Sequence, residues 1–243
     1  MPDRITSKTM YASLAGYLED LQESGVEGVP VAIPREPHPD TPKNVSHVKN
    51  LEELACQVQD CTKCGLSAER KRVVFGQGNP KARLVLVGEA PGAEEDRQGI
   101  PFVGDAGMVL TRLLKAMGLS REDVYICNVI KCRPPGNRNP HKDEIVACSG
   151  YLKQQLALIN PQVLVALGTF AAQTLLATKE PISRMRGHFH PMPGHKNLAV
   201  MPTFHPAFLL RNQENREHFW EVWDDMTKVL AHLGLPIPDK QRR

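Results

Sequence analysis

Four short apolar runs, separated by stretches with helical periodicity, constrain the fold of this 243-residue chain more than any other feature. They cover Arg83 to Val87, Val124 to Ile130, Val163 to Leu167 and Leu198 to Met201. Strands that alternate with helices are typical of a parallel or mostly parallel sheet covered by helices. We therefore expect an α/β fold whose functional loops follow the carboxyl ends of the strands.

The expected helices have recognisable ends. One runs from Ala106 to Met117 and closes on Gly118, and another has Asn139 as its cap and Pro140 at its first position. Two more are expected, one after Thr169 and one from about Gln213 to His232.

Domain organisation follows from composition. Residues 1–50 predict a poorly ordered appendage, with an amphipathic helix around 10–24 and a proline-rich linker after it. Residues 51–232 predict the globular domain, and residues 233–243 form a basic tail. No apolar run approaches the roughly 20 residues of a membrane span, and a signal-peptide core is missing. We expect a cytoplasmic protein that does not enter a membrane.

Four of the six cysteines form a pattern that suits a metal centre better than disulfides. Cys61 and Cys64 form a Cys-x2-Cys pair, and Cys132 and Cys148 arrive from distant sequence. A thioredoxin-like redox pair would follow a strand, but this pair follows a helical stretch. We favour an iron–sulfur cluster over zinc, because no second tight pair completes the usual zinc pattern. Cys56 remains an alternative ligand, since its spacing to Cys61 also resembles a ferredoxin pattern.

The loop after the first strand carries the most chemistry. It reads GEAPG from Gly88 to Gly92 and continues through an acidic trio, Glu94 to Asp96, to the glycine-rich stretch 99–107. Such a density of Gly and Pro predicts a fixed backbone. The loop matches no dinucleotide or phosphate-binding fingerprint. Carboxylates there can polarise water, and Phe102 offers a rigid stacking surface.

Two further side chains end the second and fourth strands. Asn128 carries a donor and an acceptor on one planar group and so can read the amide-like edge of a base, although an asparagine there is more often a turn residue. His205, followed by Pro206, can support charge on a departing heterocycle, although an isolated histidine is usually structural. The net charge of +3 is too small to prove a polyanionic partner. Local basic clusters at 70–72, 131–142 and 184–190 are more informative than the total.

Together these motifs resemble family 4 of the uracil-DNA glycosylase superfamily, the iron–sulfur enzymes. The resemblance rests on GEAPG, EDRQGIPFVGDAG, NVIKCRPPGNRNP and HPAFLLR, with the cysteines interleaved in the family order. It covers roughly residues 51–230. It implies a three-layer α/β/α sandwich around a four-stranded, mostly parallel sheet. It also implies a 4Fe-4S cluster on Cys61, Cys64, Cys132 and Cys148.

The resemblance further implies removal of uracil from DNA, single- or double-stranded, by an enzyme that flips the base into a pocket. We also expect the protein to be a monomer. The pocket residues it implies are Glu89, Ala90, Phe102, Asn128 and His205. Phe102 would stack on uracil, Asn128 would read its edge, and His205 would stabilise the departing anion. The general base is left open between Glu89 and Glu95, with His205 as the third catalytic candidate. The candidates for contacts to the DNA backbone are Lys131, Arg133, Arg138 and Arg211.

Two alternatives remain at this point. In the first alternative, the chain is a glycosylase for another deaminated base, such as hypoxanthine or xanthine. In the second, it is a non-catalytic iron–sulfur module that binds nucleic acid. Phe102, Asn128 and His205 occurring together favour uracil excision, because a module that only binds would not need all three.

Overall fold

The computed structural model describes residues 48–195 and 197–239. The chain divides into two units, residues 1–46 and 47–243, and the described residues all belong to the second. The expected N-terminal helix and proline-rich linker therefore lie outside the described residues.

The centre of the second unit is a six-stranded sheet in the order β1-β3-β2-β4-β6-β5. Four strands are parallel: β2 (Leu84–Gly88), β3 (Tyr125–Asn128), β4 (Val163–Leu167) and β6 (Ala199–Thr203). Each of these strands overlaps one of the four predicted apolar runs. Two-residue strands, β1 (Gln77–Gly78) and β5 (His190–Pro191), pair antiparallel at the edges. The prediction of four strands missed them because a two-residue strand has no periodicity to detect.

The parallel strands are buried on both faces. In β2, Leu84 and Leu86 pack into one core cluster, whereas Val85 and Val87 pack into the other. Every residue of β2, β3 and β4 is buried. A strand covered on both faces reads as a continuous apolar run, which is why these strands stand out in the sequence.

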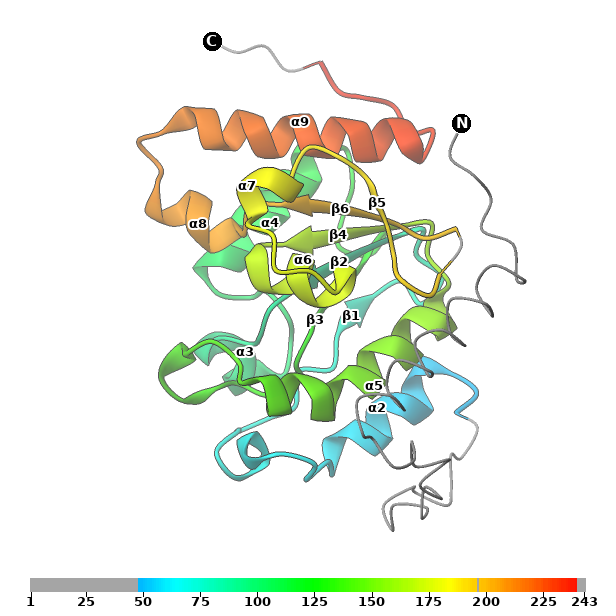
Figure 1. Cartoon of the computed structure of the whole chain (residues 1–243), viewed down its shortest axis with the longest axis vertical. Helices are drawn as coiled ribbons and strands as arrows, with labels where there is room; N and C mark the ends of the chain where they lie inside the picture. The colour runs from blue at the N-terminus through cyan, green and yellow to red at the C-terminus, as the bar shows by residue number, and fades with distance from the viewer. Residues whose placement is uncertain (1–47, 196, 240–243) are drawn as a thin grey trace, which may run out of the picture. The chain divides into compact units, whose positions relative to one another are not determined.

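Helices cover both faces and complete the predicted three-layer α/β/α arrangement (Figure 1). One face carries α4 (Asp105–Ala116), α8 (Pro206–Arg211) and α9 (Arg216–His232). The other carries α2 (Leu51–Gln59), α5 (Lys142–Ile159), α6 (Thr169–Leu176) and α7 (Ile182–Met185). A short helix, α3 (Ala93–Gln98), and two 3₁₀ turns, Gly65–Ala68 and Pro135–Asn137, lie in the connecting loops.

The start of α5 corrects one prediction. The helix begins at Lys142 with His141 as its cap, so Asn139 is not the cap and Pro140 is not its first residue. The Glu144 carboxylate accepts a hydrogen bond from the His141 N–H at 2.7 Å and holds the Arg138 guanidinium through two more bonds. These contacts fix the first turn two residues later than the proline suggests.

The other helix ends lie within about three residues of the predicted ones. Helix α4 stops at Ala116, and Gly118 after it adopts a φ of +74°. Helix α9 begins at Arg216 rather than near Gln213, with the Asn215 side chain as its cap. Leu233 beyond α9 is buried, so the folded core continues past the predicted boundary. Among the described residues no helix is long and apolar enough to cross a membrane.

Candidate active site

A cavity of about 700 Å³ opens at the carboxyl end of the parallel strands. Its walls come from the loops that directly follow β2, β3, β4 and β6, as expected for a site in an open α/β sheet. The arrowheads of β4 and β6 in Figure 1 point toward this end, where α8 begins. The cavity is lined by every predicted pocket residue, Glu89, Ala90, Phe102, Asn128 and His205, and by Glu95 and Arg211.

Phe102 forms one wall in an unusual backbone conformation. Its φ is +54°, in the left-handed region that non-glycine residues rarely adopt, and its ring is buried. The Arg121 guanidinium donates hydrogen bonds to the carbonyl oxygens of Pro101, at 2.6 Å, and Phe102, at 3.0 Å. A Cβ on Gly107 would lie 2.0 Å from the Phe102 oxygen, so only glycine permits this approach. A strained residue held by several contacts is typical of a functional site.

Asn128 lies opposite Phe102 at the end of β3. It is paired in register with Gly88 at the end of β2, and 1% of its surface is exposed. Its Oδ1 is buried and has no hydrogen-bond partner among the described residues. A buried acceptor without a partner costs about 1–3 kcal/mol, so the amide is prepared for a ligand that donates a hydrogen bond.

His205 closes the pocket at the start of α8. Its ring centroid lies 5.7 Å from that of Phe102. Nδ1 accepts a hydrogen bond from the Ala207 N–H at 3.1 Å, so the proton of the neutral imidazole is on Nε2. Burial and the positive charge of Arg211 lower the pKa of His205 to about 4, against the opposing effect of Glu95. The side chain is therefore a neutral donor at physiological pH.

The two candidate bases differ in their surroundings. The Glu95 carboxylate accepts hydrogen bonds from the backbone N–H groups of Gly92, Val103 and Gly104, at 2.9 to 3.1 Å. It thereby ties the GEAPG loop to the segment that carries Phe102. Glu89 is half-buried, and burial raises its pKa to about 7. The protonation of Glu89 therefore changes near neutral pH.

The four predicted ligand cysteines line a second, small cavity. Cys61, Cys64, Cys132 and Cys148 share it with Lys63, Arg70, Lys131 and Tyr151. By contrast, Cys56 is exposed and Cys127 lies in the core. Among the described residues, no group of three or more His, Cys, Asp or Glu side chains is arranged to hold a single metal ion.

Cations surround the cysteine cavity. Arg70 Nη1 lies 3.4 Å from Cys132 Sγ and 2.7 Å from the Cys61 carbonyl oxygen. The Lys63 ammonium lies 4.3 Å from the centre of the Tyr151 ring. Burial raises the pKa of Cys132 to about 11, although Arg70 acts in the opposite direction.

One predicted DNA contact is wrong. Lys131 is fully buried, and its Nζ donates a hydrogen bond to the Asn128 carbonyl oxygen at 2.7 Å, so its charge cannot reach a phosphate. Arg138 forms a two-bond ion pair with Glu144 and is half-buried. Arg211 is exposed on the cavity wall, and Arg133 donates to Asn137 Oδ1 at 2.7 Å.

Comparison with known sequences decides the family. Residues 75–227 match the profile of the Uracil DNA glycosylase superfamily. The chain is 50% identical over 166 residues to the type-4 uracil-DNA glycosylase of Thermotoga maritima, across 68% of this chain and 85% of that protein. It is 47% identical over 195 residues to that of Saccharolobus solfataricus, across 77% and 90% of the two chains. The chain belongs to the type-4 uracil-DNA glycosylases.

Two other matches are more distant. A type-5 uracil-DNA glycosylase from Thermus thermophilus is 37% identical to this type-4 member over 170 residues, across 62% of this chain and 77% of that protein. Among solved structures, wild-type SMUG2 of Pedobacter heparinus matches with a TM-score of 0.44 and 14% identity, across 62% and 76% of the two chains. That structural likeness is too weak to carry an argument. The resemblance noted in the sequence motifs is confirmed by the family match.

Sequence reasoning missed several residues that shape this type-4 site. Arg121 holds the Phe102 backbone, and Gly88 leaves the gap between Asn128 and Phe102. Phe170 and Ile182 complete the cavity wall. Arg121 carries no motif that points to the site, because it reaches Phe102 only through tertiary contact. The glycine at the end of β2 was noted as part of a tight loop, but its steric role depends on the strand pairing.

Proposed function

We propose that this type-4 family member removes uracil from DNA by hydrolysing the N-glycosidic bond, which leaves an abasic site. The observation that carries this proposal is the unpartnered Asn128 oxygen, buried in a cavity beside Phe102 and a neutral His205. Type-4 and type-5 relatives that are named uracil-DNA glycosylases support it. The substrate is uracil-containing DNA, and we propose that the enzyme acts as a monomer.

Base recognition follows from hydrogen-bond complementarity. A uracil in a duplex must first leave the stack, at a cost of a few kcal/mol that is smallest for a mismatched or single-stranded base. Once flipped, uracil offers its N3–H to Asn128 Oδ1 and its O4 to the Asn128 amide N–H, while the Phe102 ring stacks on its face. Cytosine presents an acceptor at N3 and a donor at N4, so both bonds would be lost. Leaving buried polar groups unpaired discriminates strongly between such analogues.

His205 is proposed to stabilise the leaving group. Cleavage of the glycosidic bond develops negative charge on uracil, and the Nε2–H of a neutral imidazole can donate a hydrogen bond to it. Because His205 has a pKa of about 4, it does not need to lose a proton first at neutral pH. Removing one such donor costs on the order of 10²–10³ in rate. We expect His205→Ala to show a loss of this size in single-turnover cleavage.

Glu89 is the proposed base that orients and activates water. A general base works best when its pKa lies near the operating pH, and Glu89 meets that condition. Glu95 is assigned a different role, because three backbone N–H groups already occupy its carboxylate. We propose that Glu95 positions the loop that carries Phe102.

We propose that Cys61, Cys64, Cys132 and Cys148 hold a 4Fe-4S cluster. The residues present fit such a group, because four thiols line one cavity with Arg70, Lys63 and Lys131 nearby to offset negative charge. A cluster offers a separate iron to each cysteine, so the thiols need not converge on one point. When bound, it supplies a structural cross-link between the Cys61–Cys64 segment, the Cys132 loop and helix α5. That brace would steady the loop leaving Asn128.

Arg211, Arg133 and Arg138 are the proposed contacts to the DNA backbone, and two of them, Arg138 and Arg211, line the cavity. Phosphate contacts fix the orientation of the duplex without reading its sequence.

The decisive experiment uses purified protein with its iron content measured. It is incubated with labelled oligonucleotides that contain uracil, thymine, hypoxanthine or xanthine, and abasic sites are then cleaved with alkali. Cleavage only at uracil supports the proposal. Cleavage at hypoxanthine or xanthine instead would assign another deaminated base, and no cleavage by cluster-loaded protein would point to a binding module.

A further inference from the structure

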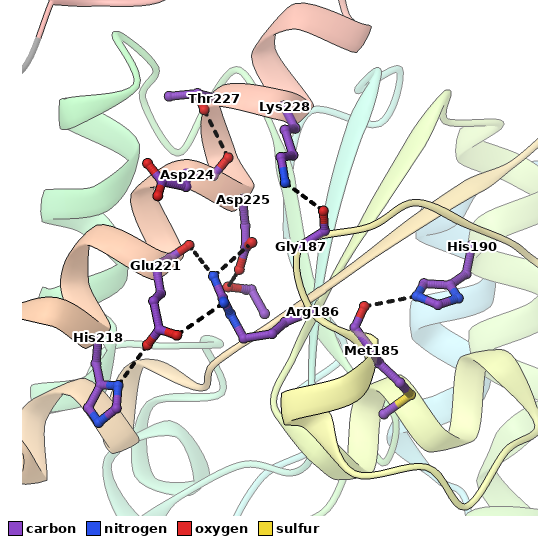
Figure 2. Close-up of polar contacts among 11 residues, drawn as sticks. Met185, Arg186, Gly187, His190, His218, Glu221, Asp224, Asp225, Thr227 and Lys228 are labelled. Atoms are coloured by element: carbon purple, nitrogen blue, oxygen red, sulfur yellow. Dashed lines mark hydrogen bonds and ion pairs between the residues drawn. The ribbon is translucent and has the colours of Figure 1, made fainter.

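A buried polar network lies next to the loop that carries His205. The Arg186 guanidinium sits between two carboxylates of α9, 3.0 Å from Asp225 Oδ1 and 3.2 Å from Glu221 Oε1 (Figure 2). Asp225 is fully buried and the Arg186 side chain is 15% exposed. Arg186 belongs to the basic cluster at 184–190, which the cavity does not use.

The network reaches the active-site loop through Thr203. Thr203 is the last residue of β6, is fully buried, and donates its hydroxyl to Asp225 Oδ2 at 2.7 Å. The two oxygens of Asp225 are therefore bound to different elements, Arg186 on one side and β6 on the other. His205 follows only two residues after Thr203. The backbone that leads to His205 therefore starts at a residue whose side chain is held by Asp225.

A second contact acts on the next residue of the same loop. The Arg186 guanidinium carbon lies 5.2 Å from the centre of the Phe204 ring. That ring packs against Phe208 at 4.7 Å and His218 at 5.4 Å. His218 in turn lies 2.8 Å from Glu221 Oε2. Residues on both sides of His205 are thus held by one connected set of contacts.

A buried ion pair is a poor source of stability, because desolvation of the two charges offsets most of their attraction. Breaking this pair would leave an uncompensated buried charge, so the pair favours the arrangement that keeps Arg186 and α9 together. Asp225 and Arg186 join α9, the segment after α7 and the end of β6 at one place. These contacts hold the loop that carries His205 in addition to its backbone hydrogen bonds.

We infer that Asp225, Arg186 and Thr203 are positioning residues for the glycosylase reaction. They hold the His205 imidazole where its Nε2–H meets the departing uracil. The inference rests on the proposed function, because it assigns the network to the same step as His205. A displacement of about 1 Å in a group of this kind can cost on the order of 10²-fold in rate.

Another threonine hydroxyl supplies a matched control. Thr227 of α9 donates its hydroxyl to the carbonyl oxygen of Asp224 in the same helix at 2.8 Å (Figure 2). This bond joins two residues of one helix and does not connect α9 to β6 or to the segment after α7. Thr227→Val therefore removes a threonine hydroxyl from α9 without releasing the loop that carries His205.

The test compares single-turnover excision rates of Thr203→Val and Thr203→Ser. Valine keeps the volume and the strand propensity of threonine but removes the donor to Asp225, whereas serine keeps the donor. We expect Thr203→Val to lower the rate about tenfold with unchanged affinity for abasic DNA. Thr203→Ser and Thr227→Val should remain within about twofold of the wild-type rate.

A double-mutant cycle separates positioning from a general structural effect. In a His205→Ala background, Thr203→Val should slow excision by less than about twofold, because the group it positions is gone. Equal slowing in both backgrounds, or no slowing in either, would overturn the inference while the proposed function stands. If Thr203→Val does not fold, Asp225→Asn, which changes a residue outside the cavity lining, replaces it in the same cycle. A folded wild-type protein that leaves uracil in place would overturn both proposals together.

Discussion

Gly88→Ala is expected to slow uracil excision about a hundredfold while the fold is retained. A Cβ at this position would lie 2.3 Å from Asn128 Oδ1 and 2.6 Å from Phe102 Cζ. Ordinary van der Waals contact begins near 3.4 Å, so the amide and the ring would each have to move by about 1 Å. Both groups are proposed to contact uracil, and a shift of that size costs on the order of 10² in rate.

The stability of the variant should change much less than its activity. Gly88 does not have a positive φ, so alanine can adopt its backbone conformation. Replacing glycine restricts the unfolded chain and contributes about 0.4–1 kcal/mol of stability. Crowding of the neighbouring side chains costs about 1–3 kcal/mol. The net loss of about 0–2.6 kcal/mol is compatible with a folded protein at 25 °C.

The assay is single-turnover cleavage of a uracil·guanine duplex, with unfolding followed in urea. Gly150→Ala is the matched control, because Gly150 lies in α5 and a Cβ there meets nothing within 4 Å. The control should keep the wild-type rate. A folded Gly88→Ala enzyme that excises uracil as fast as the control would refute the placement of the base between Asn128 and Phe102.

Three other outcomes can be checked. Because ionised Glu89 is the proposed base and its pKa is raised to about 7, the excision rate should rise about tenfold per pH unit below 7 and level off above it. Glu89→Gln should remove this pH dependence. A Glu89→Gln enzyme with an unchanged pH profile would exclude Glu89 as the general base. Cys132→Ser should lose iron, sulfide and visible absorbance, whereas Cys56→Ser should keep them, and loss of the cluster in both would contradict the ligand assignment. Arg211→Ala should reduce the magnitude of the slope of log K for DNA binding against log salt concentration by about 0.9. The control, Lys81→Ala, changes an exposed residue before β2 and should leave the slope unchanged. Equal slopes in the two variants would exclude Arg211 from the DNA contacts.

Particular residues in the sequence predicted the fold and predicted that the site residues would lie together. The β2 and β4 runs are apolar throughout because both faces of these strands are buried, so they were visible without any structure. Asn128 and His205 both follow parallel strands, and the carboxyl ends of parallel strands meet at one edge. Their meeting with Phe102 in one cavity was therefore predictable, although their functions there remain proposals.

The burial of the basic residues and the partners of their charges could not be predicted from the sequence. Lys131 and Arg133 are two positions apart in one basic stretch, yet the first is fully buried and the second is partly exposed. Nothing in the local pattern distinguishes a lysine that bonds a backbone carbonyl from one that faces solvent. The same limit applies to Arg138. Its ion-pair partner Glu144 lies in α5, whose start was predicted two residues too early.

The sequence by itself determined the family, the strand order along the chain and the residue types at the site, because those depend on local periodicity and on motifs of contiguous residues. Only the tertiary structure decided the chemistry of each group. The raised pKa of Glu89 and the lowered pKa of His205 arise from burial by distant segments, which no local pattern encodes. The link from Thr203 through Asp225 to Arg186 likewise joins three separate parts of the chain. Such contacts exist only once the sheet and its covering helices are packed together.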